Sequence, residues 1–253
     1  MALLTIAGHA LEYLWIEGTR PTMVFLHEGL GSVELWRTFP AELAASTGNS
    51  ALVYSRLGHG WSDPLSGPRP LDFMEREALE TLPALLDALE VDDPVLVGHS
   101  DGASIALIHA GAGPRPASAL IALAPHVFVE PETLAGTDAA LRAFRDDDMA
   151  QKMARYHRDP VATFHGWVDV WQDPAFRDWN IETVLPGIDC PALVIQGADD
   201  EYGTAAQLDA IESGIPGTLE RLWLADCGHS PHLDQPHQVV AAATDFIQRA
   251  VTA

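Results

Sequence analysis

The sequence predicts an α/β fold, in which a mostly parallel sheet of eight strands carries helices on both faces. Short apolar runs of strand length alternate with longer segments in which leucine and alanine recur at helical spacing. Such alternation is typical of parallel strands joined by crossover helices. Some of the apolar runs are continuous, as expected of strands buried on both faces. The 253 residues are enough for one large domain of this kind.

The predicted strands begin with a hairpin and continue as separate short runs. Gly8 and His9 separate the two arms of the hairpin, and β-branched residues recur in several of the later runs. We expect strands at residues 3–6, 11–15, 23–26, 51–54, 95–97, 119–123, 192–196 and 219–224.

The predicted helices fill the intervals between these strands. The segment 71–89 carries Leu82, Leu85, Leu86 and Leu89 at helical spacing. Further helices are expected at 35–45, interrupted by Pro40, directly after Ser100, at 205–211 and at 238–251.

Residues 126–186 break the alternation, because they contain no convincing strand pattern. Helical patterns, a charged run at 145–148 and many aromatic side chains fill this segment, and the charged run is expected to be a solvated helix face. We therefore expect a core at 1–125 and 187–253, with 126–186 as a helical cap inserted after the sixth strand. A cap over a binding site needs an apolar underside, so one or two of Phe164, Trp167 and Trp171 are expected to contact substrate.

Charge and cysteine content narrow the classes of partner. The net charge of −22, from 36 acidic and 14 basic residues, repels phosphate backbones and anionic lipids. Cys190 and Cys227 form no disulfide framework or metal-ligand spacing, and each is expected to be a small buried apolar residue. Without a recognisable signal peptide or membrane span, we expect a soluble cytoplasmic protein. Its expected partner is a small-molecule substrate, with no nucleic acid or membrane, and homodimer formation is left open.

The most informative stretch of the chain is residues 94–107, where an apolar run leads into Gly98-His99-Ser100-Asp101-Gly102 and then into a helical pattern of small residues. A serine at the apex of a strand–turn–helix is held in a strained conformation that lifts its hydroxyl clear of the sheet. Side chains two residues on either side would collide there, and Gly98 and Gly102 remove that collision. The pattern predicts a nucleophilic serine at the positive end of a helix.

A serine hydroxyl needs a base and a group that orients the base. Acidic residues follow the strand at 192–196, as Asp199 and Asp200, and His229 follows the last strand. The sequence therefore supplies serine, acid and histidine in that order at successive strand ends.

With these motifs, the chain resembles serine hydrolases of the α/β-hydrolase fold superfamily over roughly 22–125 and 188–250. The resemblance rests on residues 27–32 and 56–63, each after a strand, on the turn at Ser100 and on Gly228-His229. It implies that Ser100 is the nucleophile, His229 the general base and Asp200 the acid. Rival positions remain open: Asp199, Glu201 or Glu130 as the acid, and His232 as the base.

The same resemblance implies an oxyanion hole formed by the backbone N–H groups of Gly29 and Asp101. The chain departs from the family pattern here, because Glu28 replaces a glycine and Asp101 replaces an apolar residue. Both carboxylates are expected to point away from the oxyanion, Asp101 into the first turn of its helix or toward Arg56. Leu30 and His126 are expected to line the substrate pocket, while His27, His59 and His99 are expected to brace the backbone beneath the site.

The implied activity is hydrolysis of an ester-type bond in a small, largely apolar molecule, through an acyl-enzyme on Ser100 and with no metal or other cofactor. A carbon–carbon bond hydrolase of aromatic catabolism with the same triad is the alternative, and lactonase, thioesterase and cofactor-free haloperoxidase activities are left open. A serine at position 100 argues against haloalkane dehalogenases and epoxide hydrolases, which need a carboxylate there. A ligand receptor that keeps the fold and the triad is the alternative from another functional class.

Overall fold

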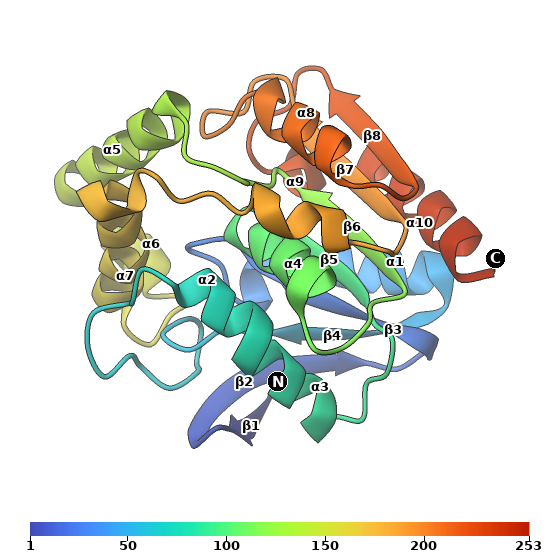
Figure 1. The fold of residues 1–253 in the computed structure, drawn as a ribbon. Coiled ribbons are helices and arrows are strands. Elements are labelled where there is room, and N and C mark those ends of the chain that lie inside the picture. Colours follow the sequence, from blue (N-terminus) through green and yellow to red (C-terminus); the bar gives the residue numbers. More distant parts are fainter. Residues whose placement is uncertain (253) are drawn as a thin grey trace.

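The computed structural model describes residues 1–252 and confirms the predicted α/β fold (Figure 1). One sheet of eight strands has the order β1-β2-β4-β3-β5-β6-β7-β8. The strands from β3 onward run parallel, whereas β2 is antiparallel to both β1 and β4. The strands are β1 (Ala2–Ile6), β2 (His9–Ile16), β3 (Thr19–Leu26), β4 (Asn49–Tyr54), β5 (Val95–His99), β6 (Ala119–Leu123), β7 (Ala192–Gly197) and β8 (Leu219–Leu224).

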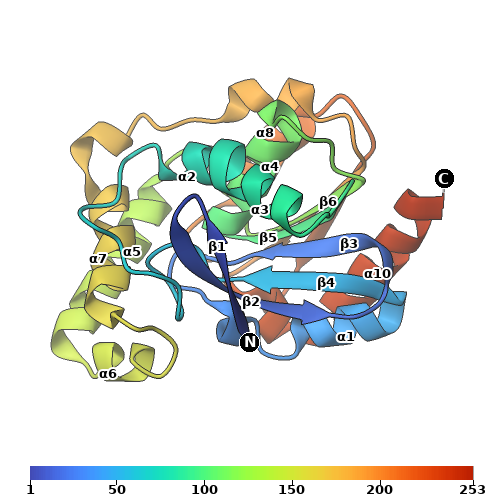
Figure 2. The same cartoon turned by 90° about the horizontal axis from the view of Figure 1, so that it is seen from below.

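Helices cover both faces of the sheet (Figure 2). On one face lie α2 (Phe73–Arg76), α3 (Leu82–Ala88), α4 (Asp101–Ala112) and α8 (Ala205–Gly214), and on the other α1 (Phe39–Thr47) and α10 (Pro236–Thr252). Side chains of one strand alternate between the two faces, so each face has a core of its own. In β3, Val24 and Leu26 pack on the first face and Met23 and Phe25 on the second.

Two predicted helices differ from the observed ones, and a proline accounts for each difference. Pro40 lies in the first turn of α1, where a missing N–H costs nothing, so the helix begins at Phe39. The residues before it form a short 3₁₀ turn, η1 (Val33–Trp36). The predicted helix at 71–89 contains a π-helical turn, η2 (Glu77–Thr81), directly before α3, whose second residue is Pro83. A proline cannot donate to the carbonyl four residues earlier, and a π turn accommodates that loss.

Between β6 and β7 the chain forms α5 (Pro131–Asp146), α6 (Met149–Met153), α7 (Pro160–Gln172), and two short turns, η3 (Pro174–Phe176) and η4 (Glu182–Gly187). Helices α5 to α7 lie together at one end of the sheet (Figures 1 and 2). The turn η4 instead packs against α4 of the core. Helices α5 to α7 are therefore the part of the predicted cap that stands away from the layered core.

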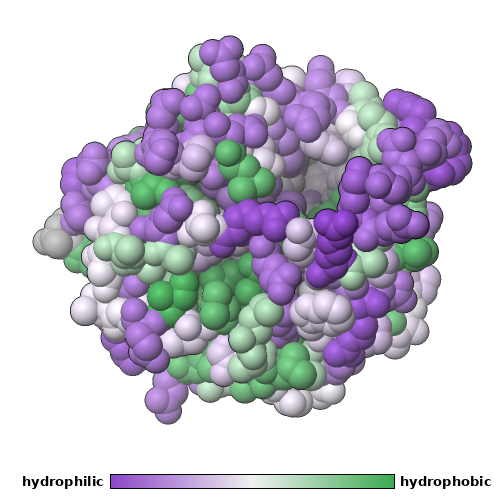
Figure 3. All heavy atoms as spheres, turned by 180° about the vertical axis from the view of Figure 1, so that it is seen from behind, coloured by the Kyte–Doolittle hydropathy of each residue, from purple (hydrophilic) through white to green (hydrophobic). Residues whose placement is uncertain are grey.

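One face of the molecule can be described in detail. On the face opposite to the view of Figure 1, polar side chains dominate and apolar ones gather in the lower middle (Figure 3). Within residues 1–252, no helix has both the length and the apolar character that a bilayer span requires. Cys227 is buried as expected, whereas Cys190 is only half-buried, and both are free thiols.

Candidate active site

Ser100 stands at the turn between β5 and α4 with a φ of 53°. This is a positive-φ conformation that non-glycine residues rarely adopt. A Cβ at Gly98 would overlap the backbone of Gly102 and Ala103, and one at Gly102 would overlap the carbonyl of Leu26. Both glycines are therefore required for the close approach of α4 to β3 and β5.

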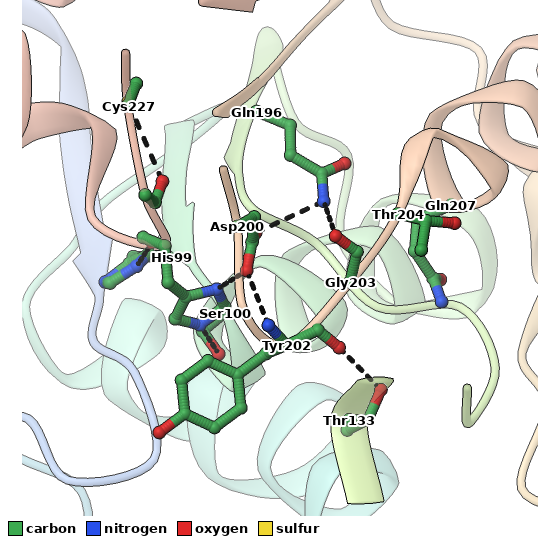
Figure 4. Close-up of polar contacts among 12 residues, drawn as sticks. His99, Ser100, Thr133, Gln196, Asp200, Tyr202, Gly203, Thr204, Gln207 and Cys227 are labelled. Carbon is green, nitrogen blue, oxygen red and sulfur yellow. Dashed lines mark hydrogen bonds and ion pairs between the residues drawn. The ribbon is translucent and has the colours of Figure 1, made fainter. Parts of the chain in front are cut away.

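The loops after β7 and β8 bring a histidine and a carboxylate to this serine. His229 Nε2 lies 2.8 Å from Ser100 Oγ, and His229 Nδ1 lies 2.8 Å from Asp200 Oδ1. The backbone N–H of Tyr202 donates to Asp200 Oδ1 at 2.9 Å, and the side-chain amide of Gln196 donates to Oδ2 at 3.2 Å (Figure 4). Because a carboxylate can only accept, His229 Nδ1 carries the proton and Nε2 is free to accept one from Ser100.

The two ionisable groups stabilise each other's charged forms. Burial lowers the pKa of His229, but the hydrogen bond and the negative charge of Asp200 outweigh burial and leave that pKa above its ordinary value. Burial raises the pKa of Asp200, but the hydrogen bond and the charge of His229 leave it below its ordinary value. Asp200 thus stays ionised beside a histidine that binds a proton more readily than it would in water.

None of the alternative acids lies beside His229 Nδ1, and the alternative base, His232, does not reach Ser100. Asp199 and Glu201 are exposed. Glu130 is buried, but its carboxylate accepts from Thr204 and Gln207 and caps α5. His232 is buried against the rings of Trp36 and Phe39, and burial lowers its pKa to about 3.

The loop after β3 is fixed by donors to its carbonyl groups. The carbonyl of Glu28 accepts from Arg56 Nη2 at 2.8 Å and from His27 Nδ1 at 2.6 Å. The carbonyl of Gly29 accepts from His59 Nε2 at 3.0 Å. Burial lowers the pKa of both histidines well below the ordinary value, so they stay neutral. Holding these carbonyls by buried donors fixes the direction of the N–H groups that alternate with them.

A third histidine, from the segment between α6 and α7, continues this arrangement. His157 Nε2 donates to the carbonyl of Leu30 at 3.0 Å, and its Nδ1 accepts from the backbone N–H of Gly60 at 3.0 Å. Burial lowers the pKa of His157, which keeps the ring neutral and both bonds in place. The inserted helices are therefore tied directly to the loop that faces Ser100.

A small cavity opens above Ser100 and His229. Core loops contribute Glu28, Gly29, Leu30, Ser100, Asp101 and His229, and the rest of its lining comes from His126, Thr133, Thr137, Trp167, Trp171 and Tyr202. Of the predicted pocket residues, Leu30, His126, Trp167 and Trp171 all line this cavity. A Cβ at Gly29 would overlap the indole of Trp167, so the absence of a side chain at Gly29 lets that indole close over the loop.

Phe164 is the predicted substrate contact that does not reach the cavity. Its ring is fully buried and stacks on Phe144 at 3.9 Å between centroids, with the edge of Trp167 beside it. It packs the hydrophobic interior of the inserted helices, with Trp167 closer to the site. Helical spacing alone places Phe164 and Trp167 on similar faces and does not separate these roles.

The carboxylate of Asp101 has a different partner from the one expected. Trp171 Nε1 donates to Asp101 Oδ1 at 3.1 Å, whereas Arg56 Nη2 is bound to the Glu28 carbonyl. Of the two orientations expected for Asp101, the one toward Arg56 is therefore wrong, although the positive charge of Arg56 still acts on Asp101 at longer range. Burial raises the pKa of Asp101 in spite of that charge.

Replacing Asp101 by asparagine is expected to leave the free energy of unfolding within about 1 kcal/mol of the native value, because the amide oxygen can still accept from Trp171 and no buried charge remains. Chemical denaturation of the two proteins measures this. A loss of more than about 2 kcal/mol would mean that the negative charge itself is needed for stability, which this hydrogen bond does not require.

Three pocket residues carry no sequence motif and were missed. Tyr202 follows Asp200 by two residues, and its ring lies 4.6 Å from the His229 ring. Thr133 and Thr137 share one face of α5, and Thr133 Oγ1 donates to the Tyr202 carbonyl (Figure 4). In the sequence, Thr133 and Thr137 are four residues apart and follow Glu130, which could have indicated a shared pocket face. The same spacing is equally typical of ordinary helix packing.

Comparison with known proteins gives matches along most of the chain. A profile described as the Alpha/beta hydrolase family matches residues 23–243. Serine hydrolase BPHL of Homo sapiens is 29% identical over 212 residues, which cover 79% of this chain and 69% of that protein.

Solved structures agree in fold. The enol-lactonase from Burkholderia xenovorans LB400 superposes with a TM-score of 0.77 at 19% identity, covering 98% of this chain and 100% of that one. A thermophilic esterase from Thermogutta terrifontis gives a TM-score of 0.74 at 20% identity, covering 99% of each chain. With its sheet order, its strained serine turn and the profile match over most of its length, this chain belongs to the alpha/beta hydrolase family.

Proposed function

We propose that this protein is a serine hydrolase that cleaves an ester-type bond through an acyl-enzyme on Ser100. The observation that carries the proposal is the unbroken line from Asp200 through His229 to Ser100, with both contacts at 2.8 Å. Nucleophile, base and orienting acid in hydrogen-bond reach are what acyl transfer to an alcohol requires. Membership of a hydrolase family supports the same reaction class.

In the first half of the proposed reaction, His229 Nε2 takes the Ser100 proton as Ser100 Oγ attacks the carbonyl carbon. Asp200 stabilises the imidazolium that forms and keeps its Nδ1–H in place. The tetrahedral intermediate collapses as the imidazolium gives its proton to the leaving alcohol. In the second half, His229 takes a proton from water, the resulting hydroxide attacks the acyl carbon, and the carboxylic acid leaves as Ser100 regains its proton.

The developing oxyanion is assigned to the backbone N–H groups of Gly29 and Asp101. Asp101 N–H lies at the first turn of α4, where the helix dipole favours negative charge. Gly29 lies in the loop whose carbonyls are held by buried donors, so its N–H does not have to reorganise during the reaction.

The size and lining of the cavity favour a substrate with a small and uncharged acyl group. Its small size and its aromatic walls suit a compact apolar molecule. Among the described residues that line the cavity, none is a lysine or an arginine, so a negatively charged acyl group would find no cation to pair with.

The experiment that tests this function is a substrate panel assayed with the wild-type protein and with Ser100→Ala. Short p-nitrophenyl esters are expected to be turned over by the wild type alone, and an uncharged acyl chain to give a higher kcat/KM than a dicarboxylate half-ester of equal length. Lactones, thioesters and vinylogous diketones complete the panel. Turnover of the diketones without turnover of esters would assign carbon–carbon bond hydrolysis instead, and saturable ligand binding without any turnover would assign a receptor.

The pH dependence follows from the state of His229. The reaction needs the neutral imidazole, and the pKa of His229 is raised above 6.5 by Asp200, with smaller contributions from Glu201 and Glu28. We therefore expect kcat/KM to fall as pH drops through a midpoint above 6.5 in the free enzyme. Initial rates at low substrate concentration across the acid range measure it. A profile that stays flat well below that midpoint would rule out a histidine base.

A further inference from the structure

Next to the triad of Asp200, His229 and Ser100, a second acidic residue, Glu28, lies beside a second histidine, His99. The ring of His99, the residue before Ser100, is almost fully buried between the loops after β3 and β8. Its Nε2 lies 2.7 Å from the backbone carbonyl of His229. The other ring nitrogen of His99, Nδ1, lies 3.5 Å from Glu28 Oε2. His99 therefore bridges a carboxylate of the loop after β3 and the backbone of His229.

Both ends of the His99 ring face an acceptor. A carbonyl oxygen can only accept, so the contact at 2.7 Å requires a proton on Nε2. At the other end, Nδ1 has no hydrogen-bond partner among the described residues, and the Glu28 carboxylate is the charged group closest to it. The ring is confined sideways by His232, at 4.9 Å between centroids, and by Trp36, at 6.2 Å.

Glu28 is held so that its carboxylate stays beside His99. Its backbone carbonyl is fixed by His27 and Arg56. A Cβ at Gly31 would overlap the Glu28 carboxylate, so Gly31 leaves the space into which this side chain folds. Burial raises the pKa of Glu28, but the nearby His99 ring outweighs it and holds the pKa well below its usual range. The Glu28 carboxylate is thus ionised at neutral pH.

We propose that Glu28 and His99 are positioning residues that hold His229 in place, with Glu28 acting through the His99 ring on the backbone carbonyl of His229. The proposal rests on the proposed function, because it assigns the pair to the base of that reaction. It explains why a carboxylate occupies the glycine position of the loop after β3. It also joins that loop, the serine turn and the histidine loop into one rigid unit.

The catalytic consequence is geometric. His229 Nε2 must stay 2.8 Å from Ser100 Oγ, and a displacement of about 1 Å in such a contact lowers rates by about 10²-fold. An uncharged ester has no charge for Glu28 to act on, so kcat is expected to change and KM is not. A side chain that contacts substrate through its charge would instead change KM according to the charge of the ester.

The test is a double-mutant cycle on full-length protein with an uncharged p-nitrophenyl ester. We expect Glu28→Gln to lower kcat by about tenfold and His99→Met by about 10²-fold, each with KM within about twofold of wild type. The double variant is expected to match His99→Met alone, because Glu28 has no route to His229 without the ring. His99→Gln, which keeps an N–H near the position of Nε2, is expected to retain more activity than His99→Met.

Glu201→Gln is the matched control, because it removes an exposed carboxylate that also acts on His229 but lies outside the contact with His99. The proposal is overturned if Glu201→Gln lowers kcat as much as Glu28→Gln does. It is also overturned if the losses of Glu28→Gln and His99→Met multiply in the variant that carries both. A third contrary result is a Glu28→Gln variant whose KM changes with the charge of the ester while its kcat stays constant. Glu28 is partly exposed, so its variant keeps the test decisive if His99→Met does not fold. Ser100→Ala in the same assay separates the two proposals, since activity surviving there refutes the proposed function whatever the cycle gives.

Discussion

Replacing Ser100 by alanine is expected to lower kcat for ester hydrolysis by about 10⁴-fold or more. The change removes only the Oγ that lies 2.8 Å from His229 Nε2, so no acyl-enzyme can form. The cavity and the assigned oxyanion donors remain, and substrate binding is expected to survive with a nearly unchanged dissociation constant. Steady-state rates with a p-nitrophenyl ester, corrected for the spontaneous reaction, measure the loss.

Ser118→Ala is the control for this change, because Ser118 lies before β6, at the opposite end of that strand from the site. It is expected to keep the wild-type rate. If Ser100→Ala keeps more than about 1% of wild-type activity, another group must be the nucleophile and the proposed mechanism fails.

Replacing Asp200 by asparagine is expected to lower kcat/KM by about 10³- to 10⁴-fold. The amide can present an N–H₂ group to His229 Nδ1, which favours the tautomer that has its proton on Nε2 and cannot accept from Ser100. The charge that raises the pKa of His229 is also lost, so the acid limb of the remaining activity is expected to move to lower pH.

Asp199→Asn is the matched control for Asp200, because the neighbouring carboxylate is exposed to solvent. It is expected to change kcat/KM by less than about threefold. Equal losses in the two variants would mean that negative charge near His229 matters and that the 2.8 Å hydrogen bond to Asp200 does not.

The sequence predicts the sheet and the placement of Ser100, Asp200 and His229 because each depends on local pattern. Strand runs, the glycines around Ser100 and the short segments after β7 and β8 can all be recognised within about ten residues of chain. In a parallel sheet the carboxyl ends of the strands share one edge, so residues that follow different strands are brought together there. This rule predicts that a serine, an acid and a histidine meet, whereas the choice of Asp200 over Asp199 came from the resemblance to α/β-hydrolases.

The contacts across the inserted helices could not be predicted in the same way. Asp101 pairs with Trp171, which lies 70 residues away in the sequence, and His157 reaches the Leu30 carbonyl across 127 residues. Which face of α7 meets the core depends on how α5 to α7 pack together. Periodicity in one helix does not contain that information, so Trp171 could be expected near the site but its bond to Asp101 could not.

Prolines explain the errors in helix boundaries. Helical spacing of leucines continues across Pro83, and the apolar pattern before α1 continues across Pro40. The chain responds differently at the two sites, with a π turn at one and a new helix start at the other. The choice depends on what packs against each segment, which the local sequence does not specify.

The most direct test of the account is mass spectrometry of the protein quenched with acid during turnover of a slowly deacylating p-nitrophenyl ester. The account predicts a mass increase equal to the acyl group, located on the peptide that contains Ser100, and absent from Ser100→Ala. Hydrolysis without any acyl adduct, or an adduct on another residue that persists in Ser100→Ala, would contradict a covalent intermediate on Ser100.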